Sequence, residues 1–225
     1  MVVALAAFEW ARLCRLDAHA GRLYAAGAVT AYLILFHAAL ERVAFAAGAA
    51  YWLLVAVPWL LRGVAARHAP ALAAAGFLIL LPPALAMVSL PPAEVLLVIG
   101  LVSVADTAAY FAGRAWGRHK LAPAISPGKS WEGAAAGLAA GVAYAIICAA
   151  AFHESAWAGY VGAAALLVVM SIFGDLFESA AKRQAAVKDS GSLLPGHGGV
   201  LDRIDSATAT LPLAAFLWPF LERIN

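Results

Sequence analysis

Acidic, basic and glycine residues gather in one segment of this chain, residues 174–206, between two long apolar runs. The segment contains nine charged side chains: Asp175, Glu178, Lys182, Arg183, Lys188, Asp189, Asp202, Arg203 and Asp205. Ionisable groups at membrane depth cost about a few kcal/mol each or more, so they are rare there and usually functional. Carboxylates and bases at this density are typical of a site that handles a metal ion and phosphate groups.

The spacing of these residues places them on helical faces. The first group follows the intervals i, i+3, i+4, i+7 and i+8 and consists of Asp175, Glu178, Ser179, Lys182 and Arg183. One helical face therefore carries acids at the membrane and bases above it. The second group shares a face at the start of the final apolar run and consists of Asp202, Asp205 and Ser206.

The loop between these groups contains the run Pro195-Gly-His-Gly-Gly199. Its amides have few side chains in the way, which suits the close approach of an anion. Two carboxylates from different helices would hold a hard cation such as Mg²⁺, which prefers oxygen ligands and bridges carboxylates to substrate phosphates. The nearby bases would then neutralise phosphate oxygens. The simpler alternative is a solvated charged loop between two helices.

A second cluster lies upstream, where four residues follow the intervals i, i+4, i+7 and i+8: Asp106, Tyr110, Gly113 and Arg114. This spacing predicts one helical face, with the Asp106 carboxylate buried about two turns deep and Arg114 at the membrane boundary. The alternative is that Asp106 is a structural partner for a base on a neighbouring helix.

A third cluster, Ser126-Pro-Gly-Lys-Ser-Trp-Glu-Gly133, immediately precedes a long apolar run. Ser130 is expected to cap the new helix, with Glu132 in its first turn. Exposed amides there, with Lys129 close by, would make a phosphate cradle. The glycine spacing of a P-loop is absent. The alternative is a capped amphipathic helix start with a tryptophan at the interface.

The composition places these clusters in a membrane protein. The 225 residues are 64% hydrophobic and 12% charged, with a mean hydropathy of +0.86, whereas soluble domains are about 45–50% apolar and about 25% charged. Cys14 and Cys148 lie far apart, so neither a disulfide framework nor a thiolate metal site is expected. We expect one membrane domain over residues 1–225.

Apolar runs long enough to cross the hydrocarbon core, about 20 residues, predict an all-α polytopic fold with about seven spans. The candidate spans are 23–40, 43–61, 71–89, 93–113, 131–152, 157–177 and 204–222. Val2 to Leu13 is apolar but too short to span. Pro82-Pro83 and Pro91-Pro92 are expected to bracket the turn between two spans.

The basic residues are divided unequally between the two sets of loops. Thirteen lie in the loops around 12–22, 62–70, 114–130 and 178–203, and only Arg42 and Arg223 lie on the opposite side. The positive-inside rule therefore places the basic loops, and all three polar clusters, in the cytoplasm.

The stretch from Ser179 to Asp205 closely resembles the signature of phosphatidate cytidylyltransferases, also called CDP-diacylglycerol synthases, nearly position for position over 27 residues. The clusters around Asp106 and Ser126 and the stretch Glu9-Trp-Ala-Arg-Leu13 are similar to that family in the same order. The chain departs from the family at Ala181, where a larger apolar residue is usual. The family usually has one or two further spans before the Glu-Trp motif, whereas only eight residues precede Glu9 in this sequence.

The resemblance implies that CTP and phosphatidate react to give CDP-diacylglycerol and pyrophosphate, at a multi-pass protein of the cytoplasmic (inner) membrane. It implies Mg²⁺ held by Asp175 and Asp202, and it leaves open a second cation. The remaining catalytic residues that it implies are Lys182, Arg183, Lys188, Asp189, Arg203 and Asp205. The substrate-binding residues that it implies are Asp106, Tyr110, Arg114, Ser126, Lys129, Ser130, Glu132, Glu178, Ser179, His197, Gly198 and Gly199. Membrane lipid is a further expected partner, a homodimer is compatible with the family, and nucleic acid is not expected.

Two other functions are compatible with parts of the sequence. A CTP-dependent polyprenol or phytol kinase would transfer the γ-phosphoryl group instead of CMP, and the long signature argues against it. A secondary transporter would use Asp106 and Asp175 as coupling carboxylates. Transporter sites usually lie near the membrane midplane at broken helices, whereas these polar groups cluster toward one face.

Overall fold

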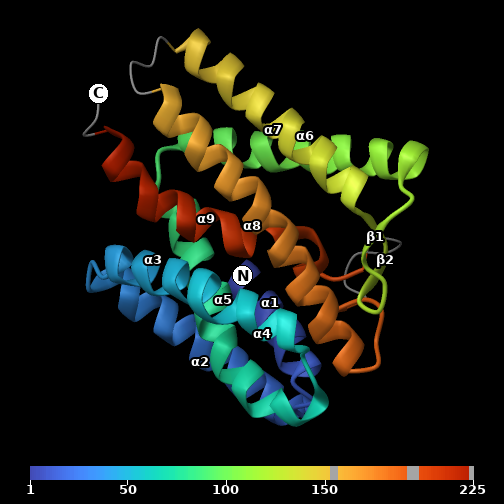
Figure 1. Cartoon of the computed structure of the whole chain (residues 1–225). Coiled ribbons are helices and arrows are strands. Elements are labelled where there is room, and N and C mark those ends of the chain that lie inside the picture. Colours follow the sequence, from blue (N-terminus) through green and yellow to red (C-terminus); the bar gives the residue numbers. More distant parts are fainter. Residues whose placement is uncertain (153–156, 192–197, 223–225) are drawn as a thin grey trace.

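A computed structural model describes residues 1–152, 157–191 and 198–222, and long helices dominate it (Figure 1). The N-terminal part contains α1 (Val2–Leu13), α2 (Ala18–His37), α3 (Glu41–Ala50), the π-helical η1 (Tyr51–Ala56), α4 (Val57–Arg62) and the 3₁₀ turn η2 (Ala66–His68). The remainder contains α5 (Ala69–Ser89), α6 (Pro92–Trp116), β1 (Lys120–Ala122), β2 (Ser126–Ser130), α7 (Trp131–Ala151), α8 (Trp157–Gln184) and α9 (Leu201–Glu222).

Within these described ranges, six helices are long and apolar enough to cross a membrane. They are Glu41–Arg62, Ala66–Ser89, Pro92–Trp116, Trp131–Ala151, Trp157–Gln184 and Leu201–Leu221. This confirms the prediction of an all-α polytopic membrane protein. The seventh predicted span, 23–40, overlaps α2, which is not among these six helices. A count of seven spans therefore stays a prediction.

Two proline-containing segments show how membrane helices accommodate this residue. The helix Glu41–Arg62 widens into the π-helical segment Tyr51–Ala56 directly before Pro58, which has no amide hydrogen to donate. Pro82 and Pro83 lie inside α5 and are buried, so the prediction that they bracket a turn is wrong. Pro82 packs against Gly48 of α3, where an added Cβ would lie 2.9 Å from Pro82 Cβ.

Close helix crossings depend on glycines that face a neighbouring backbone. On α7 a Cβ at Gly133 would lie 2.7 Å from the Ala109 carbonyl oxygen of α6, and one at Gly137 would lie 2.9 Å from that of Ala105. On α8 a Cβ at Gly174 would lie 2.8 Å from the Asp205 carbonyl oxygen of α9. Small residues let membrane helices approach this closely. The crossing of α8 and α9 therefore falls beside Asp175 and Asp205.

The short helix α1 is buried among longer ones. Its Trp10 is 1% exposed, and the indole Nε1 donates to the Leu72 carbonyl oxygen of α5 at 2.8 Å. At the end of α1, the Leu13 carbonyl oxygen accepts from Gln184 Nε2 at 2.5 Å, while Arg15 Nη2 donates to the Gln184 carbonyl oxygen at 2.6 Å. These bonds fix α1 against the C-terminal end of α8.

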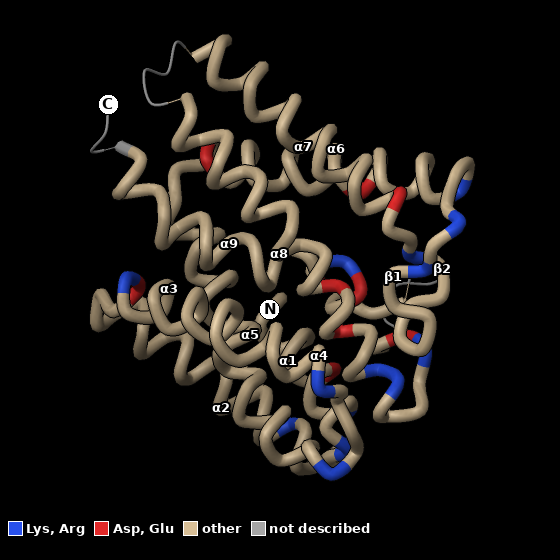
Figure 2. Tube along the Cα trace, viewed as in Figure 1, with Lys and Arg blue, Asp and Glu red and all other residues tan. Residues whose placement is uncertain are grey.

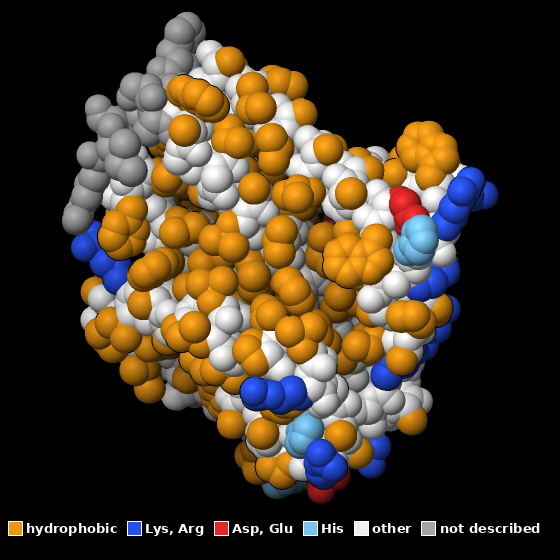
Figure 3. Space-filling view, viewed as in Figure 1, with side chains coloured by type: hydrophobic (Ala, Val, Ile, Leu, Met, Phe, Trp, Pro, Cys, Tyr) orange, Lys and Arg blue, Asp and Glu red, His pale blue; other side chains and the backbone are white. Residues whose placement is uncertain are grey.

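Charged residues gather at one end of the molecule, around the β-hairpin, the C-terminal end of α8 and the start of α2 (Figure 2). Arg42 and Glu41 lie at the start of α3, away from that end. Hydrophobic side chains cover much of the remaining face in Figure 3. This distribution agrees with the separation of basic and apolar segments seen in the sequence.

Candidate active site

The β-hairpin places the third sequence cluster, residues 126–133, next to α8. Ser130 ends β2 and caps α7, since its Oγ accepts from the Gly133 amide at 3.2 Å, which confirms the predicted cap. One residue earlier, Lys129 Nζ lies 2.6 Å from Oδ2 of Asp175. The hairpin and α8 therefore form one site, although 46 positions separate the two residues in the sequence.

The predicted polar face of α8 is confirmed by contacts along the helix. Ser179 Oγ donates to Asp175 Oδ1 at 3.2 Å, and Lys182 Nζ lies 3.4 Å from Glu178 Oε1. The side chains of Glu178 and Lys182 are 5% and 12% exposed. Acids and a base thus share a largely buried surface, where charges interact more strongly than in bulk water.

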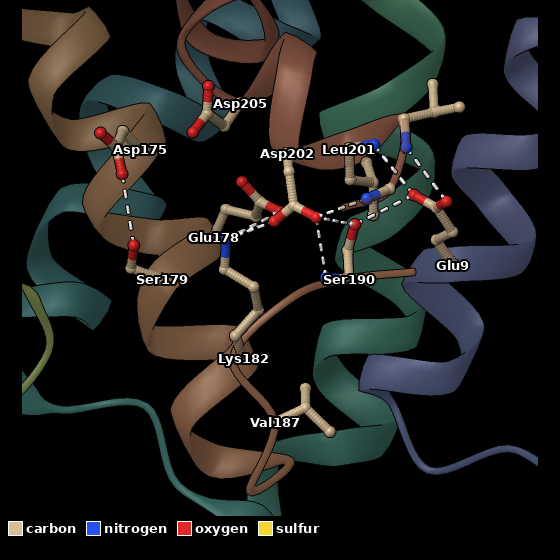
Figure 4. Close-up of polar contacts among 12 residues, drawn as sticks. Glu9, Asp175, Glu178, Ser179, Lys182, Val187, Ser190, Leu201, Asp202 and Asp205 are labelled. Carbon is tan, nitrogen blue, oxygen red and sulfur yellow. Dashed lines mark hydrogen bonds and ion pairs between the residues drawn. The ribbon is translucent and has the colours of Figure 1, made fainter. Parts of the chain in front are cut away.

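Asp202 joins α8 to the glycine loop at the start of α9 (Figure 4). Its Oδ1 accepts from Lys182 Nζ at 2.6 Å. Its Oδ2 accepts from the Ser190 amide at 3.0 Å, the Ser190 hydroxyl at 2.9 Å and the Gly199 amide at 2.7 Å. Because four donors surround this carboxylate, Asp202 fixes both ends of the loop as well as the position of Lys182.

Glu9 of α1 contacts the same loop from the other side. The residue is 5% exposed, and its Oε2 accepts from the Ser190 hydroxyl at 3.0 Å and the Leu201 amide at 2.9 Å. Its Oε1 accepts from the Val200 amide at 3.0 Å. Figure 4 shows Glu9 and Asp202 on opposite sides of Ser190.

A cavity of about 330 Å³ lies between α1, α5, α6 and α9. Its charged and hydroxyl lining includes Asp106, Arg203, Asp205 and Ser206, and most of the rest is apolar. Asp205 lies within electrostatic range of Asp175, Lys182 and Lys129. Asp106 lies within the candidate span Pro92–Trp116 and lines this cavity, and its depth in the membrane stays a prediction.

Other predicted site residues make contacts at the edge of the cluster. Arg114 Nη1 donates to the exposed Tyr110 hydroxyl at 3.2 Å on the surface of α6. Glu132 accepts from His119, with Oε1 and Nδ1 2.7 Å apart. Neither pair includes Asp175 or Asp202. Of the residues in the third sequence cluster, Lys129 therefore contacts Asp175, whereas Glu132 contacts His119 next to the hairpin.

The remaining predicted site residues lie on α8, on the loop that follows it and on β2. Arg183 Nε donates to the Ile125 carbonyl oxygen at 3.2 Å and Nη1 to that of Val187 at 3.3 Å, which ties the hairpin to the loop. Lys188 and Asp189 are exposed, and Ser126 is partly buried in β2. Gly198 has a φ of 81°, a left-handed conformation that favours glycine. His197 lies outside the described residues.

The donor set and the charge balance fit a hard cation. The acids Asp106, Asp175, Glu178, Asp202 and Asp205 face the bases Lys129, Lys182 and Arg203. Both Glu178 carboxylate oxygens are buried without a hydrogen bond in the described part of the chain. Such oxygen-rich, acid-rich surroundings are typical of Mg²⁺ sites. Among the described residues, however, no three His, Cys, Asp or Glu side chains are already arranged as a metal cluster.

Sequence reasoning assigned no site role to Glu9 or Ser190. Glu9 is an acid within the apolar stretch Val2–Leu13, and a carboxylate in such a stretch is the signal that could have drawn attention to it. Ser190 carries no comparable signal, because a serine beside a glycine is ordinary in a loop. Only the folded chain shows that its hydroxyl lies between two carboxylates.

Comparison with known proteins identifies the family of the chain. The sequence profile described as the cytidylyltransferase family matches residues 1–221. The phosphatidate cytidylyltransferase of Pseudomonas aeruginosa is 44% identical over 236 residues, covering 96% of this chain and 85% of that protein. Those of Haemophilus influenzae and Thermotoga maritima are 46% and 38% identical over 54% and 59% of this chain, covering 44% and 51% of those proteins. The chain belongs to the cytidylyltransferase family.

Proposed function

We propose that this protein is an enzyme that transfers CMP from CTP to phosphatidate and releases pyrophosphate. The observation that carries this proposal is the cavity between α1, α5, α6 and α9. Its apolar part suits an acyl chain, and its other part carries Arg203 beside Asp106 and Asp205. A lipid acceptor with a phosphate headgroup requires both kinds of surface. The close relationship to phosphatidate cytidylyltransferases supports the same substrate pair.

The reaction is an in-line displacement at phosphorus. A phosphate oxygen of phosphatidate forms a bond to the α-phosphorus of CTP, the bond from that phosphorus to the α,β-bridging oxygen breaks, and pyrophosphate leaves with the bonding electrons. A phosphate monoester is largely ionised near neutral pH because its second pKa is about 6, so no general base is required. Positioning and charge neutralisation supply most of the catalysis in such transfers.

Lys129, Lys182 and Arg203 are the bases best placed for this neutralisation. Lys129 and Lys182 are each held 2.6 Å from a carboxylate oxygen, of Asp175 and Asp202 respectively. Each ammonium group can exchange that carboxylate for a phosphate oxygen while remaining in the same site. We propose that Lys182 moves from Asp202 to a CTP phosphate on binding, which frees Asp202 Oδ1.

We propose that Mg²⁺ is held by Asp175 and Asp202, with Asp205 beside them. When bound, Mg²⁺ would neutralise the charge that develops on the pyrophosphate oxygens. Asp202 can contribute Oδ1 once Lys182 has left it, because the three donors at Oδ2 are fixed by the loop. Removal of divalent cations with EDTA should abolish transfer, and added Mg²⁺ should restore it.

We also propose that the protein lies in the cytoplasmic membrane with this site facing the cytoplasm. Basic residues favour the cytoplasmic side of a membrane, and in the structure they gather at the end that carries the site (Figure 2). CTP is a soluble nucleotide, so an opening toward the cytoplasm gives it direct access. A homodimer stays a prediction.

The test is CMP transfer in detergent micelles containing phosphatidate and Mg²⁺, with CTP labelled at the α-phosphate. We expect labelled CDP-diacylglycerol from the wild type and from Glu41→Gln, a matched acid-to-amide change at the start of α3. We expect none from Asp202→Asn. A lipid product labelled only from γ-labelled CTP would instead identify a kinase, and equal activity of Asp202→Asn would refute the assigned site.

A further inference from the structure

We infer that Glu9 of α1 is a positioning residue for CMP transfer, an inference that rests on the proposed function. Glu9 holds the loop that carries Ser190 and Gly199 together with the start of α9, and through them it sets the position of Asp202. It acts through these groups and does not contact substrate.

The burial of Glu9 is the first argument. A carboxylate that is 5% exposed loses most of its hydration and is stable only if donors replace the lost water. Among the described residues that donate to it, the amides of Val200 and Leu201 lie at the start of α9. The first amides of a helix have no partner within that helix, and this helix end favours negative charge. Glu9 thus satisfies the N-terminus of a helix about 190 positions away.

The glycines around Glu9 provide an independent argument. A Cβ at Gly191 would clash with Glu9 Oε1, and one at Gly199 would clash with Glu9 Oε2. Both ends of the loop therefore approach this carboxylate so closely that no side chain fits between them. Glycine at these two positions leaves room for the Glu9 carboxylate. A buried carboxylate with no role in positioning the loop would not need glycine at either position.

Ser190 connects this contact to the proposed catalytic residues. Its hydroxyl lies 3.0 Å from Glu9 Oε2 and 2.9 Å from Asp202 Oδ2, and the single hydroxyl hydrogen is shared between the two carboxylates. Asp202 in turn accepts from Lys182. A continuous polar chain therefore runs from α1 through the loop and α9 to α8, as Figure 4 shows. A shift of the loop at Glu9 moves the donors that orient Asp202.

We expect replacement of Glu9 to affect the binding of CTP more than the binding of the lipid. The loop carries Gly198 and Gly199, which we expect to shape the nucleotide site. Its described residues 190, 191, 198 and 199 do not line the cavity that we assign to the lipid. In Glu9→Gln the amide NH₂ faces at least one backbone N–H or hydroxyl donor, so the loop shifts while the side-chain volume is kept. Residues that orient primary ligands typically change activity about 10- to 100-fold when they are replaced.

The experiment compares Glu9→Gln with Trp10→Phe, its neighbour on the same helix. Trp10→Phe removes the hydrogen bond to Leu72 and weakens the attachment of α1 without touching the loop. With purified, monodisperse protein in micelles, we expect Glu9→Gln to lower kcat/KM for CTP about 10- to 100-fold, mainly through KM. The KM for phosphatidate should stay unchanged, and Trp10→Phe should alter only the Tm.

Limited trypsin digestion supplies a readout that needs no activity. Lys188 is exposed on the loop, and Arg67 is exposed in a distant turn. We expect Glu9→Gln to speed cleavage after Lys188 and to leave cleavage after Arg67 unchanged. Wild-type kinetics for CTP together with a wild-type cleavage rate would overturn the inference. If the wild type makes no CDP-diacylglycerol, the proposed function fails, and the trypsin comparison alone decides the role of Glu9.

Discussion

At the scale of single residues, Lys182 has the central position in this site. Its ammonium group lies 2.6 Å from Asp202 Oδ1 and 3.4 Å from Glu178 Oε1, with the lysine side chain only 12% exposed. One cation therefore balances two largely buried acids. Breaking a buried pair by removing one partner costs about 3–5 kcal/mol, because the other charge stays behind uncompensated.

We therefore predict that Lys182→Met abolishes CMP transfer and lowers the Tm markedly in micelles. The double variant Lys182→Met/Glu178→Gln should recover part of the lost Tm, because it removes one uncompensated acid, and it should remain inactive. Thermal unfolding of the purified variants measures both effects. A double variant less stable than the single one would show that Glu178 does not depend on Lys182.

A second prediction at this scale concerns Cys14, which ends α1. Burial raises the pKa of its thiol to about 12, and the residue is 3% exposed. At pH 8 the reactive thiolate fraction is then about 10⁻⁴, since each pKa unit is tenfold. We expect Cys14 to resist N-ethylmaleimide in the native protein and to react after denaturation, as mass spectrometry of the labelled peptides would show. Rapid native labelling would mean that α1 detaches from its neighbours.

At the scale of elements, local patterns predicted the helical faces and failed for contacts between distant segments. The polar face from Asp175 to Arg183 could be predicted because helical periodicity alone brings those residues together. The ion pair of Lys129 with Asp175 depends on how the β-hairpin folds back, and no local pattern encodes that. The prediction of a turn at Pro82 and Pro83 failed because both lie buried inside α5, where Pro82 packs against Gly48 of a helix that is distant in the sequence.

The crossing of α7 over α6 gives the prediction for this scale. A Cβ at Gly137 would lie 2.9 Å from the Ala105 carbonyl oxygen, so Gly137→Val should push α7 away from α6 and carry Lys129 away from Asp175. We expect a lower Tm and a lower kcat. Gly162→Ala on α8 is the matched control, because a Cβ there meets nothing within 4 Å, and alanine is the better helix former. Equal effects of both changes would refute the close crossing.

At the scale of the whole molecule, charged residues and apolar surface are separated. The proposed substrates, soluble CTP and the lipid phosphatidate, would therefore meet where the charged end adjoins the apolar surface. The hairpin, the end of α8 and the start of α9 carry charged residues (Figure 2), while apolar side chains cover much of the face seen in Figure 3. This arrangement could be predicted from the sequence because the basic residues divide 13 to 2 between the two sets of loops. The cavity could not, since its lining comes from four separate helices.

The orientation of the whole molecule provides the last prediction. In a protein lacking Cys14 and Cys148, single cysteines at Lys120 in the hairpin and at Leu40 before α3 probe opposite ends, and both positions are exposed. Membrane-impermeant maleimide should label Lys120→Cys only in inverted vesicles and Leu40→Cys only in right-side-out vesicles. The reverse pattern would place the site outside the cell, where no cytoplasmic CTP reaches it. Because the charged hairpin and the acids of α8 are joined by the pair of Lys129 with Asp175, the sidedness of Lys120 is also that of the site.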